Sequence, residues 1–343
     1  MIFRRCIIIL IFLAINLINL NAFEYIDGNI KIFINEKTGS FSLYYLNNPD
    51  TLNYVPLFNA EEPRASYFSV ILDGHVHKLG QSNIFRTRLE RDSEIPVITY
   101  ESLNLTVTKS FAPVRTISSR EINGVKISVT ISNTGSRTVS AGLRILLDTY
   151  LGEEKNENHF VTNRQIISRE TLLRGASGEL FWVSRNSNYS IMGSIIDPLD
   201  ENAKVPDSLH FANWRRLYNV PWTLSYIPNR SLDYRPYSMQ DSAVCYFYDP
   251  AQLDPGESFV YTIYLSTEDY PRYGLASPNS DNMLPVLADI TDKQTDAQTV
   301  SYNNDNLKLM LMMQETLKKF IAGEIYLDAQ DIDEIERSIN GLK

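Results

Sequence analysis

Hydrophobic residues recur at every second position over most of the chain, in short runs separated by turn residues. In residues 30–34 every second residue is isoleucine, and after a turn at Gly39 apolar residues alternate again in residues 41–45. Two such runs around a glycine-containing turn predict a β-hairpin. Further strands are predicted at Tyr67–Leu72, Val97–Tyr100, Leu103–Phe111, Val114–Glu121, Val125–Ile131, Val139–Tyr150, Leu180–Val183, Tyr189–Ile196, Ala243–Tyr248 and Ser258–Leu265.

Tight turns and not helices separate these runs, which indicates antiparallel sheets packed face to face. We therefore predict a mainly β domain at residues 23–269, a large antiparallel two-sheet sandwich. Residues 197–241 are rich in proline, asparagine and aromatic residues, and we expect an irregular excursion there. Residues 270–304 carry three prolines among many polar residues and are expected to form a linker.

Beyond the linker the hydrophobic period changes to that of a helix. The pattern over residues 305–343 predicts two amphipathic helices that form a helical hairpin. A hairpin of this size cannot bury its own apolar face, so it must lie on the sandwich or on a protein partner. The residues expected to face that partner are Leu307, Met310, Met313, Leu317 and Phe320.

The N-terminus has the three parts of a secretory signal peptide. Arg4 and Arg5 precede an apolar run of about 15 residues, and Ala22 supplies a small residue for cleavage. The run is shorter than the roughly 20 residues that a spanning helix needs. We therefore expect residues 1–22 to be a signal peptide and the mature chain to be exported, with the periplasm as its place and no transmembrane span.

Charge and cysteine content narrow the class of partner. Loss of Arg4 and Arg5, with no acid, moves the formal charge from −9 to about −11. Nucleic acid and anionic membranes require clustered positive charge, so neither is an expected partner.

Cys245 would be the one cysteine of the mature chain, which excludes an internal disulfide. Its apolar surroundings in sequence predict a buried thiol.

Residues 139–152 read Val-Ser-Ala-Gly-Leu-Arg-Ile-Leu-Leu-Asp-Thr-Tyr-Leu-Gly. The alternation predicts a strand with Leu143, Ile145 and Leu147 on one face, whereas Arg144 and Asp148 share the other. Arg144 and Asp148 could therefore pair with each other or with neighbours. Asp148 is expected to bond to free backbone donors at the strand's end, and the alternative is a ligand site formed with nearby acids such as Glu153.

This segment resembles one found in uncharacterised exported β-sandwich proteins of bacteria, in which a strand runs G-L-R-x-L-L-D-T-x-L-G. The general layout is similar to the large sandwich of sugar mutarotases and of the accessory domains of some glycosidases, and this similarity implies a supersandwich-like fold. The signal peptide and the appended helices resemble those of spirochaetes, which implies a periplasmic flagellar or other envelope assembly as a partner. The mutarotase mechanism needs a positioned His and Glu, and the sequence identifies no such pair.

No motif in the sequence specifies a metal, a cofactor or a catalytic set, so neither a cofactor nor an enzyme is predicted. His75 and His77 alternate after a turn, but a transition-metal site needs a third or fourth ligand, and exposed hairpin histidines are expected. Acids and asparagines at residues 153–157 and 197–202 suit calcium in composition. Neither segment has the spacing of a known calcium loop, so the question of a bound calcium stays open.

The excursion carries the richest candidate binding chemistry, because aromatic rings and arginines anchor protein interfaces and stack on sugars. The alternative is that these side chains fix the loop itself through cation–π contacts. The predicted binding residues are Trp214, Arg215, Arg216, Tyr218, Trp222 and Arg235.

Taken together, these patterns favour a non-catalytic periplasmic interaction or scaffold protein. The alternative is a carbohydrate-binding or sugar-modifying protein of the mutarotase or glycosidase-accessory type.

Overall fold

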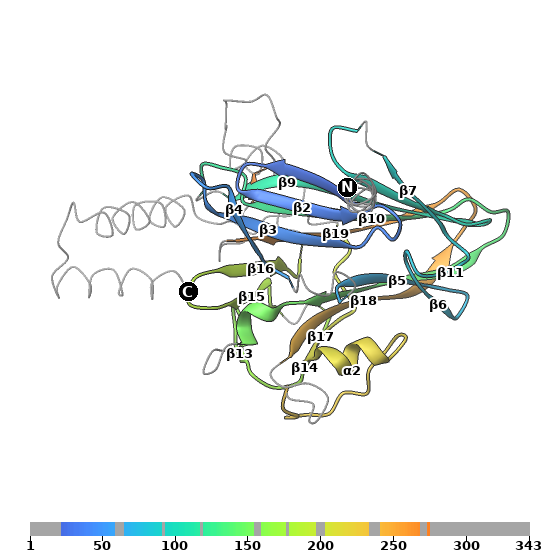
Figure 1. Ribbon diagram of the computed structural model, residues 1–343. Helices are drawn as coiled ribbons and strands as arrows, with labels where there is room; N and C mark the ends of the chain where they lie inside the picture. Colours follow the sequence, from blue (N-terminus) through green and yellow to red (C-terminus); the bar gives the residue numbers. More distant parts are fainter. Residues whose placement is uncertain are drawn as a thin grey trace, which may run out of the picture. The chain divides into compact units, whose positions relative to one another are not determined.

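The computed structural model describes residues 22–58, 65–90, 93–116, 119–153, 159–175, 178–196, 203–232, 241–267 and 273–274. These ranges form three antiparallel β-sheets with very little helix (Figure 1). The mainly β prediction is confirmed. Three predicted segments lie outside the described residues: the signal peptide up to residue 21, the linker apart from residues 273–274, and the helical hairpin at 305–343. None of the helices within these ranges has the length and apolar character to cross a membrane.

The largest sheet supplies one layer of the sandwich. Its strands are β7 (Arg86–Glu90), β8 (Val97–Glu101), β9 (Leu105–Thr116), β10 (Gly124–Asn133), β12 (Phe160–Thr162), β13 (Ile166–Ile167), β15 (Phe181–Arg185), β16 (Ser190–Ser194), β19 (Ser258–Ser266) and β20 (Tyr273–Gly274). They lie in the order β13-β12-β15-β16-β19-β10-β9-β8-β7, and β20 pairs with β9.

One strand of this sheet is longer than the sequence predicts. The strands expected at 103–111 and 114–121 are joined in β9, although Pro113 lies between them. Pairing between β8 and β9 ends at Ser110, whereas pairing with β10 continues past Pro113. Pro113 therefore has a ladder neighbour on one side only, and a sheet tolerates proline at such an edge position.

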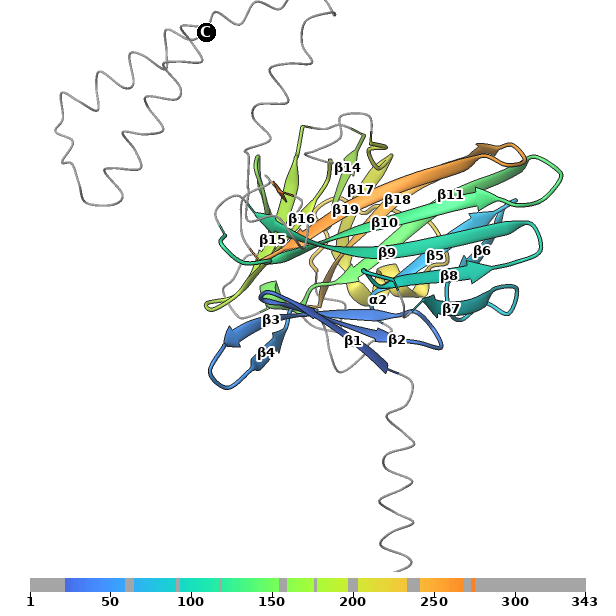
Figure 2. The same cartoon turned by 90° about the horizontal axis from the view of Figure 1, so that it is seen from above.

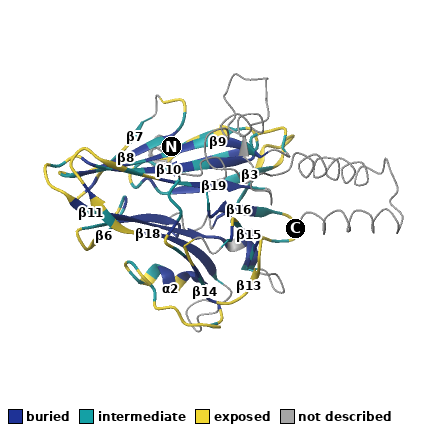
Figure 3. Ribbon diagram, turned by 180° about the vertical axis from the view of Figure 1, so that it is seen from behind, coloured by how far each residue is buried: buried dark blue, intermediate teal, exposed yellow. Residues whose placement is uncertain are grey.

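The second layer is a six-stranded sheet. Its strands are β5 (Tyr67–Leu72), β6 (His75–Lys78), β11 (Val139–Asp148), β14 (Thr171–Arg174), β17 (Ser208–Asn213) and β18 (Ser242–Leu253), in the order β14-β17-β18-β11-β5-β6. Leu143, Ile145 and Leu147 of β11 belong to the main core, with Ile127 and Val129 of β10. Figure 3 shows burial concentrated on the strands of these two sheets, with exposed residues at the turns.

A third, four-stranded sheet was not predicted. It contains β1 (Ala22–Asp27), β2 (Ile30–Asn35), β3 (Phe41–Asn48) and β4 (Asn53–Pro56), and lies along one side of the two larger sheets (Figure 2). The ring of Phe41 lies 5.1 Å from that of Phe111 in β9 and 6.0 Å from that of Phe68 in β5. Phe41 therefore contacts both layers, and this sheet closes the sandwich where they meet.

The excursion at 197–241 is more regular than expected in its described part. β17 pairs with β14 and β18, and the helix α2 (Trp214–Asn219) follows it directly. The side chain of Asn213 accepts hydrogen bonds from the backbone nitrogens of Arg215 and Arg216, at 3.0 and 3.3 Å. An asparagine N-cap of this kind satisfies donors that the first turn leaves free. The excursion thus adds a strand and a short helix to the sandwich.

The helix α2 covers the outer face of the six-stranded sheet (Figure 1). Trp214 and Leu217 join Leu146, Cys245 and Phe247 in a second apolar cluster there. β11 is consequently buried on both faces, which explains its nearly continuous apolar sequence. The predicted burial of the Cys245 thiol is confirmed, and burial raises its pKa to about 11.

A buried lysine lies in the main core. Lys109 occupies an inward position of β9, between Val107 and Phe111, and is 2% exposed. Its Nζ donates to the carbonyl oxygen of Gly39 at 2.7 Å and lies 4.6 Å from the centre of the Phe68 ring. Burial lowers the pKa of Lys109 to about 7. The hydrogen bond from Lys109 links the turn between β2 and β3 to the large sheet. The cost is an amine in the core that water does not solvate.

We expect Lys109→Met to be stabilising by about 1–4 kcal/mol at pH 7, because an apolar side chain of similar length removes the desolvation cost of the buried charge. In the wild type both states are protonated below pH 7. Between about pH 7 and 10.5 the folded state alone has released the proton, so wild-type stability rises with pH in that window. Urea unfolding at pH 7 and 9 should show the difference between the two proteins shrinking. A difference that does not change with pH would contradict this account.

Candidate functional site

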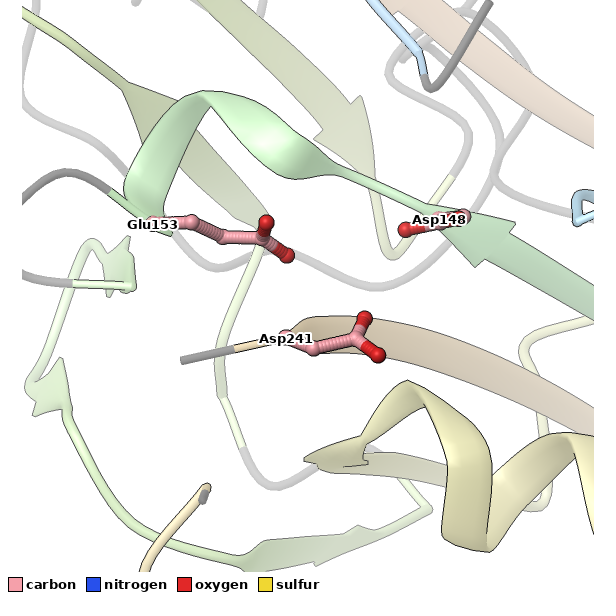
Figure 4. A group of neighbouring side chains, drawn as sticks. All are labelled: Asp148, Glu153 and Asp241. Carbon is pink, nitrogen blue, oxygen red and sulfur yellow. The ribbon is translucent and has the colours of Figure 1, made fainter. Parts of the chain in front are cut away.

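Three carboxylates converge at one end of the six-stranded sheet. Asp148 is the last residue of β11, Glu153 ends the 3-10 helix η1 (Tyr150–Glu153), and Asp241 immediately precedes β18. One carboxylate oxygen from each lies within 4.8 Å of the others. Figure 4 shows the three side chains directed toward a common space. We call them the carboxylate cluster.

Strand pairing brings the cluster together. In the antiparallel pair of β11 and β18, Asp148 lies opposite Ala243. The backbone nitrogen of Ser242 donates to Oε1 of Glu153 at 2.8 Å, and the backbone nitrogen of Asp148 donates to the Ser66 hydroxyl at 2.9 Å. The ladder and these two hydrogen bonds fix the positions of Asp148 and Glu153 relative to the start of β18.

The N-terminus of α2 fixes the third member. The carbonyl oxygen of Asp241 accepts hydrogen bonds from the backbone nitrogen of Trp214 at 2.9 Å and from the side-chain amide of Asn213 at 3.0 Å. Asn213 therefore caps the helix and also positions the residue that leads into β18. Asn213, the last residue of β17, therefore helps to fix the position of the Asp241 backbone in the cluster.

A buried ion network anchors the same helix. The guanidinium of Arg216 pairs with the Glu170 carboxylate, and Nε2 of His210 lies 3.3 Å from Oε1 of the same group. Burial lowers the pKa of His210 to about 4, so its ring is neutral at pH 7. The side chains of His210 and Glu170 are only 2% and 1% exposed, which suits a structural role. This is a His–Glu pair that the sequence did not reveal, because its members lie 40 residues apart.

Burial and the closeness of the three acids dominate the electrostatics at Glu153. Burial is the main cause that raises the pKa of the Glu153 carboxyl to about 9; the Ser242 amide opposes the shift, and the charges of Asp148 and Asp241 add to it. Arg144 shares a face of β11 with Asp148, but it donates to the Tyr67 hydroxyl at 2.6 Å and the Leu217 carbonyl at 2.7 Å. Arg144 therefore pairs with neighbours, which is one of the two outcomes expected from the sequence.

The donor set suits a hard divalent cation. Carboxylate oxygens are the ligands that calcium prefers, and three carboxylates supply three to six of its usual six to eight ligands. The buried hydroxyls of Thr149 and Ser242, next in sequence to Asp148 and Asp241, have no hydrogen-bond partner in the described part of the chain. Buried polar groups of that kind call for an explanation, and a nearby ion with its water ligands is one.

The histidines of the β5–β6 hairpin do not join a metal-ligating group among the described residues. His75 is exposed, and Nδ1 of His77 lies 3.1 Å from the Ser82 hydroxyl. The one group of three that the described ranges contain is the carboxylate cluster.

The structure brings several of the predicted aromatic binding residues together, on the outer face of the six-stranded sheet. Trp214 is 9% exposed, and its indole nitrogen donates to the Ala65 carbonyl at 3.1 Å. Its ring lies 4.9 Å from that of Tyr218, and the Trp222 ring lies 6.1 Å from that of Phe247. These rings pack inward against the second apolar cluster, so they hold the excursion in place.

The predicted arginines have different environments. Arg215 is exposed beside the Trp214 ring, at 5.9 Å, whereas Arg216 is buried in the ion pair with Glu170. Arg235 lies outside the described residues. A binding role for this set stays a prediction, with Arg215 and Trp222 as its more accessible members.

From the sequence, a ligand role for Asp148 and Glu153 was only the alternative to a structural role for Asp148, and Asp241 was missed. Glu153 and Ser242, next to Asp241, are 89 residues apart and meet only through strand pairing. The sequence does contain one local signal for Asp241. It is an acid directly before an apolar strand, which indicates a position at the end of a sheet. A second signal was needed to choose it among the 41 acids of the chain.

No family model and no curated protein sequence matches the chain. Among solved structures, a putative aldose 1-epimerase from Escherichia coli K12 is 11% identical, with 72% of this chain and 98% of that chain covered and a TM-score of 0.41. A galactose mutarotase-like protein from Lactobacillus casei is 8% identical over 72% and 100%, with a TM-score of 0.44. A galactose mutarotase related enzyme from Lactobacillus acidophilus is 10% identical over 72% and 97%, with a TM-score of 0.39. All three scores are below 0.5, so function has to be argued from the residues of this chain.

We expect the pH dependence of unfolding in a chelator to change in Glu153→Gln. The wild-type folded state keeps a proton on Glu153 up to about pH 9, whereas the unfolded state loses it near pH 4.5. Metal-free wild-type stability therefore falls as pH rises through this window. The variant removes the titrating charge, so it should lose several degrees less in Tm between pH 5 and 8. Equal losses in the two proteins would show that Glu153 is not the titrating group.

Proposed function

We propose that the protein is an exported, non-catalytic binding protein of the cell envelope whose sandwich is completed by a divalent cation. The convergence of Asp148, Glu153 and Asp241 within 4.8 Å carries the proposal. Calcium is the favoured ion, because the ligands are oxygens and no histidine or thiolate among the described residues joins them. The localisation outside the cytoplasm rests on the N-terminal sequence. Extracellular modules bind calcium in the range of about 10⁻⁴–10⁻³ M, which suits such a compartment.

A cation bound at this position would stabilise the arrangement of strands and helix and would not serve catalysis. The cluster joins the end of β11, η1 and the start of β18, and Asp241 is also held by α2. An ion bound there would therefore link the six-stranded sheet to the helix on its outer face. Asp148 is 2% exposed, which leaves little room for a substrate to reach it. These points favour a structural or regulatory cation over a catalytic one.

Calcium should raise the melting temperature of chelator-treated protein. At a free concentration about a hundred times the Kd, linkage gives about 2.7 kcal/mol of stabilisation. This corresponds to a rise of roughly 5–10 °C for a domain of this size. The rise should be lost in Asp148→Asn, Glu153→Gln and Asp241→Asn, measured by differential scanning fluorimetry.

The matched control for that titration is Glu94→Gln, which removes one exposed acid elsewhere in the chain. It should respond to calcium as the wild type does. A response that survives in all three cluster variants would place the ion at another site. The absence of any response in the wild type would remove the proposed cation.

The scaffold role requires a partner, and the helical pattern after residue 305 is its proposed docking element, with Met310, Met313 and Phe320 in the apolar stripe. Deletion of residues 305–343 should abolish capture of a partner from native envelopes while the melting temperature stays within about 2 °C of the wild type. Unimpaired capture, or a large drop in melting temperature, would contradict the docking role. The readouts are affinity pull-down and thermal unfolding of the same preparations.

A further inference from the structure

A polar cleft of about 350 Å³ lies apart from the carboxylate cluster. It is lined on one side by Asn29 and Tyr45 of the four-stranded sheet and on the other by residues 185–190, which end β15, form the turn and begin β16. The volume falls at the small end of the range of about 300–1,000 Å³ found for small-molecule sites. None of the three carboxylates of the cluster lines this cleft.

Internal hydrogen bonds hold the walls of the cleft in place. The side chain of Asn186 accepts from the backbone nitrogens of Asn188 and Tyr189, at 3.0 and 2.8 Å. The Ser190 hydroxyl donates to the Thr267 carbonyl at 2.9 Å. These bonds fix the β15–β16 turn to itself and to the end of β19, so this wall is formed before any ligand arrives.

The opposite wall is equally well tied to the large sheet. The backbone nitrogen of Asn29 donates to the Ile122 carbonyl at 2.8 Å, and the backbone nitrogen of Thr267 donates to the Asn123 carbonyl at 3.0 Å. Asn123 also bonds to Thr116 through both atoms of its amide, at 2.8 and 2.9 Å. These bonds join the β1–β2 turn of the four-stranded sheet to the residues just before β10, at the lining of the cleft.

Other lining groups have no hydrogen-bond partner among the described residues. The side-chain amides of Asn29 and Asn188 and the hydroxyls of Tyr45 and Tyr189 make no hydrogen bond in the described part of the chain. The rings of Tyr45 and Tyr189 pack against the main core, which restrains them. Each amide offers both donors and an acceptor, and each phenol offers one of each. The cleft therefore combines a fixed frame with unused groups of both kinds.

The chemistry of the lining selects the class of ligand. Among the described residues that line the cleft there is no acid, and Arg185 contributes the one cationic side chain, so a cationic ligand is disfavoured. The lining is too polar for a lipid tail. Neighbouring hydroxyls of a sugar donate and accept in the same way as the amides and phenols that face them. We propose that this cleft binds a single sugar residue, neutral or carboxylated, as a free sugar or as the end of a glycan.

This site goes beyond the proposed cation function and does not depend on it. The two sites share no residue, so sugar binding should persist in a chelator that removes the cation. Failure of one proposal therefore leaves the other open to its own test.

The test is isothermal titration of the full mature chain, in chelator, with galactose, glucose, N-acetylglucosamine and galacturonate up to about 10 mM, a range that detects millimolar Kd values. We expect at least one sugar to bind. The double variant Asn29→Ala/Asn188→Ala should weaken it by about tenfold or more, because it removes two side-chain amides that each hydrogen-bond to the sugar. Tyr189→Phe removes only one hydroxyl and should weaken binding by several-fold. Asn53→Ala, an exposed asparagine of β4, is the matched control and should bind as the wild type does.

The outcomes separate clearly. Binding that is lost in the cleft variants and kept in Asn53→Ala supports the proposal, and tighter binding of galacturonate would identify Arg185 as the carboxylate contact. Binding that is unchanged in the cleft variants but lost in Trp222→Ala would place the sugar on the aromatic excursion and overturn the proposal. No binding of any of the four sugars by folded wild-type protein overturns it as well.

Discussion

The antiparallel pairing of β11 with β18 determines how the rest of the candidate cation site is built. It sets Asp148 opposite Ala243, so the last residue of one strand meets the first residues of the other. The chain arrives at that end of β18 through Asp241, whose carbonyl the first turn of α2 holds. Glu153 reaches the same point from η1 and accepts the Ser242 amide. A slip of one residue in this register would turn Asp148 to the other face and separate the carboxylates.

The same register explains why β11 is buried on both faces. Its inward residues fill the sandwich, and its outward residues lie under α2 and the aromatic excursion. Polar groups on the outward face must then find partners without water. Arg144 does so through Tyr67 and the Leu217 carbonyl. A carboxylate oxygen of Asp148, on the same face, lies within 4.8 Å of oxygens of Glu153 and Asp241. Like charges in a desolvated site either take up protons or recruit a cation. The raised pKa of Glu153 describes the first response, and the proposed calcium ion is the second.

Much of the sandwich could be predicted because one face of each strand is buried and the sequence alternates accordingly. The face assignment of Leu143, Ile145 and Leu147 is confirmed, as is the burial of Cys245. The four-stranded sheet was missed because period-two patterns do not say which strands share a sheet. Trp214 looks like a binding residue in sequence, but the Asn213 cap turns the chain into α2 and directs the indole toward Ala65. The place of Asp241 in the carboxylate cluster and the polar cleft beside Tyr189 both depend on pairing between distant strands. Such pairing has no signature in the local sequence.

A crystal structure of the mature protein grown with calcium tests the central claim most directly. The account predicts one ion with carboxylate oxygens of Asp148, Glu153 and Asp241 at about 2.3–2.6 Å and waters completing the shell. Density that shows no ion at saturating calcium, with the carboxylates sharing protons or separated, would contradict it.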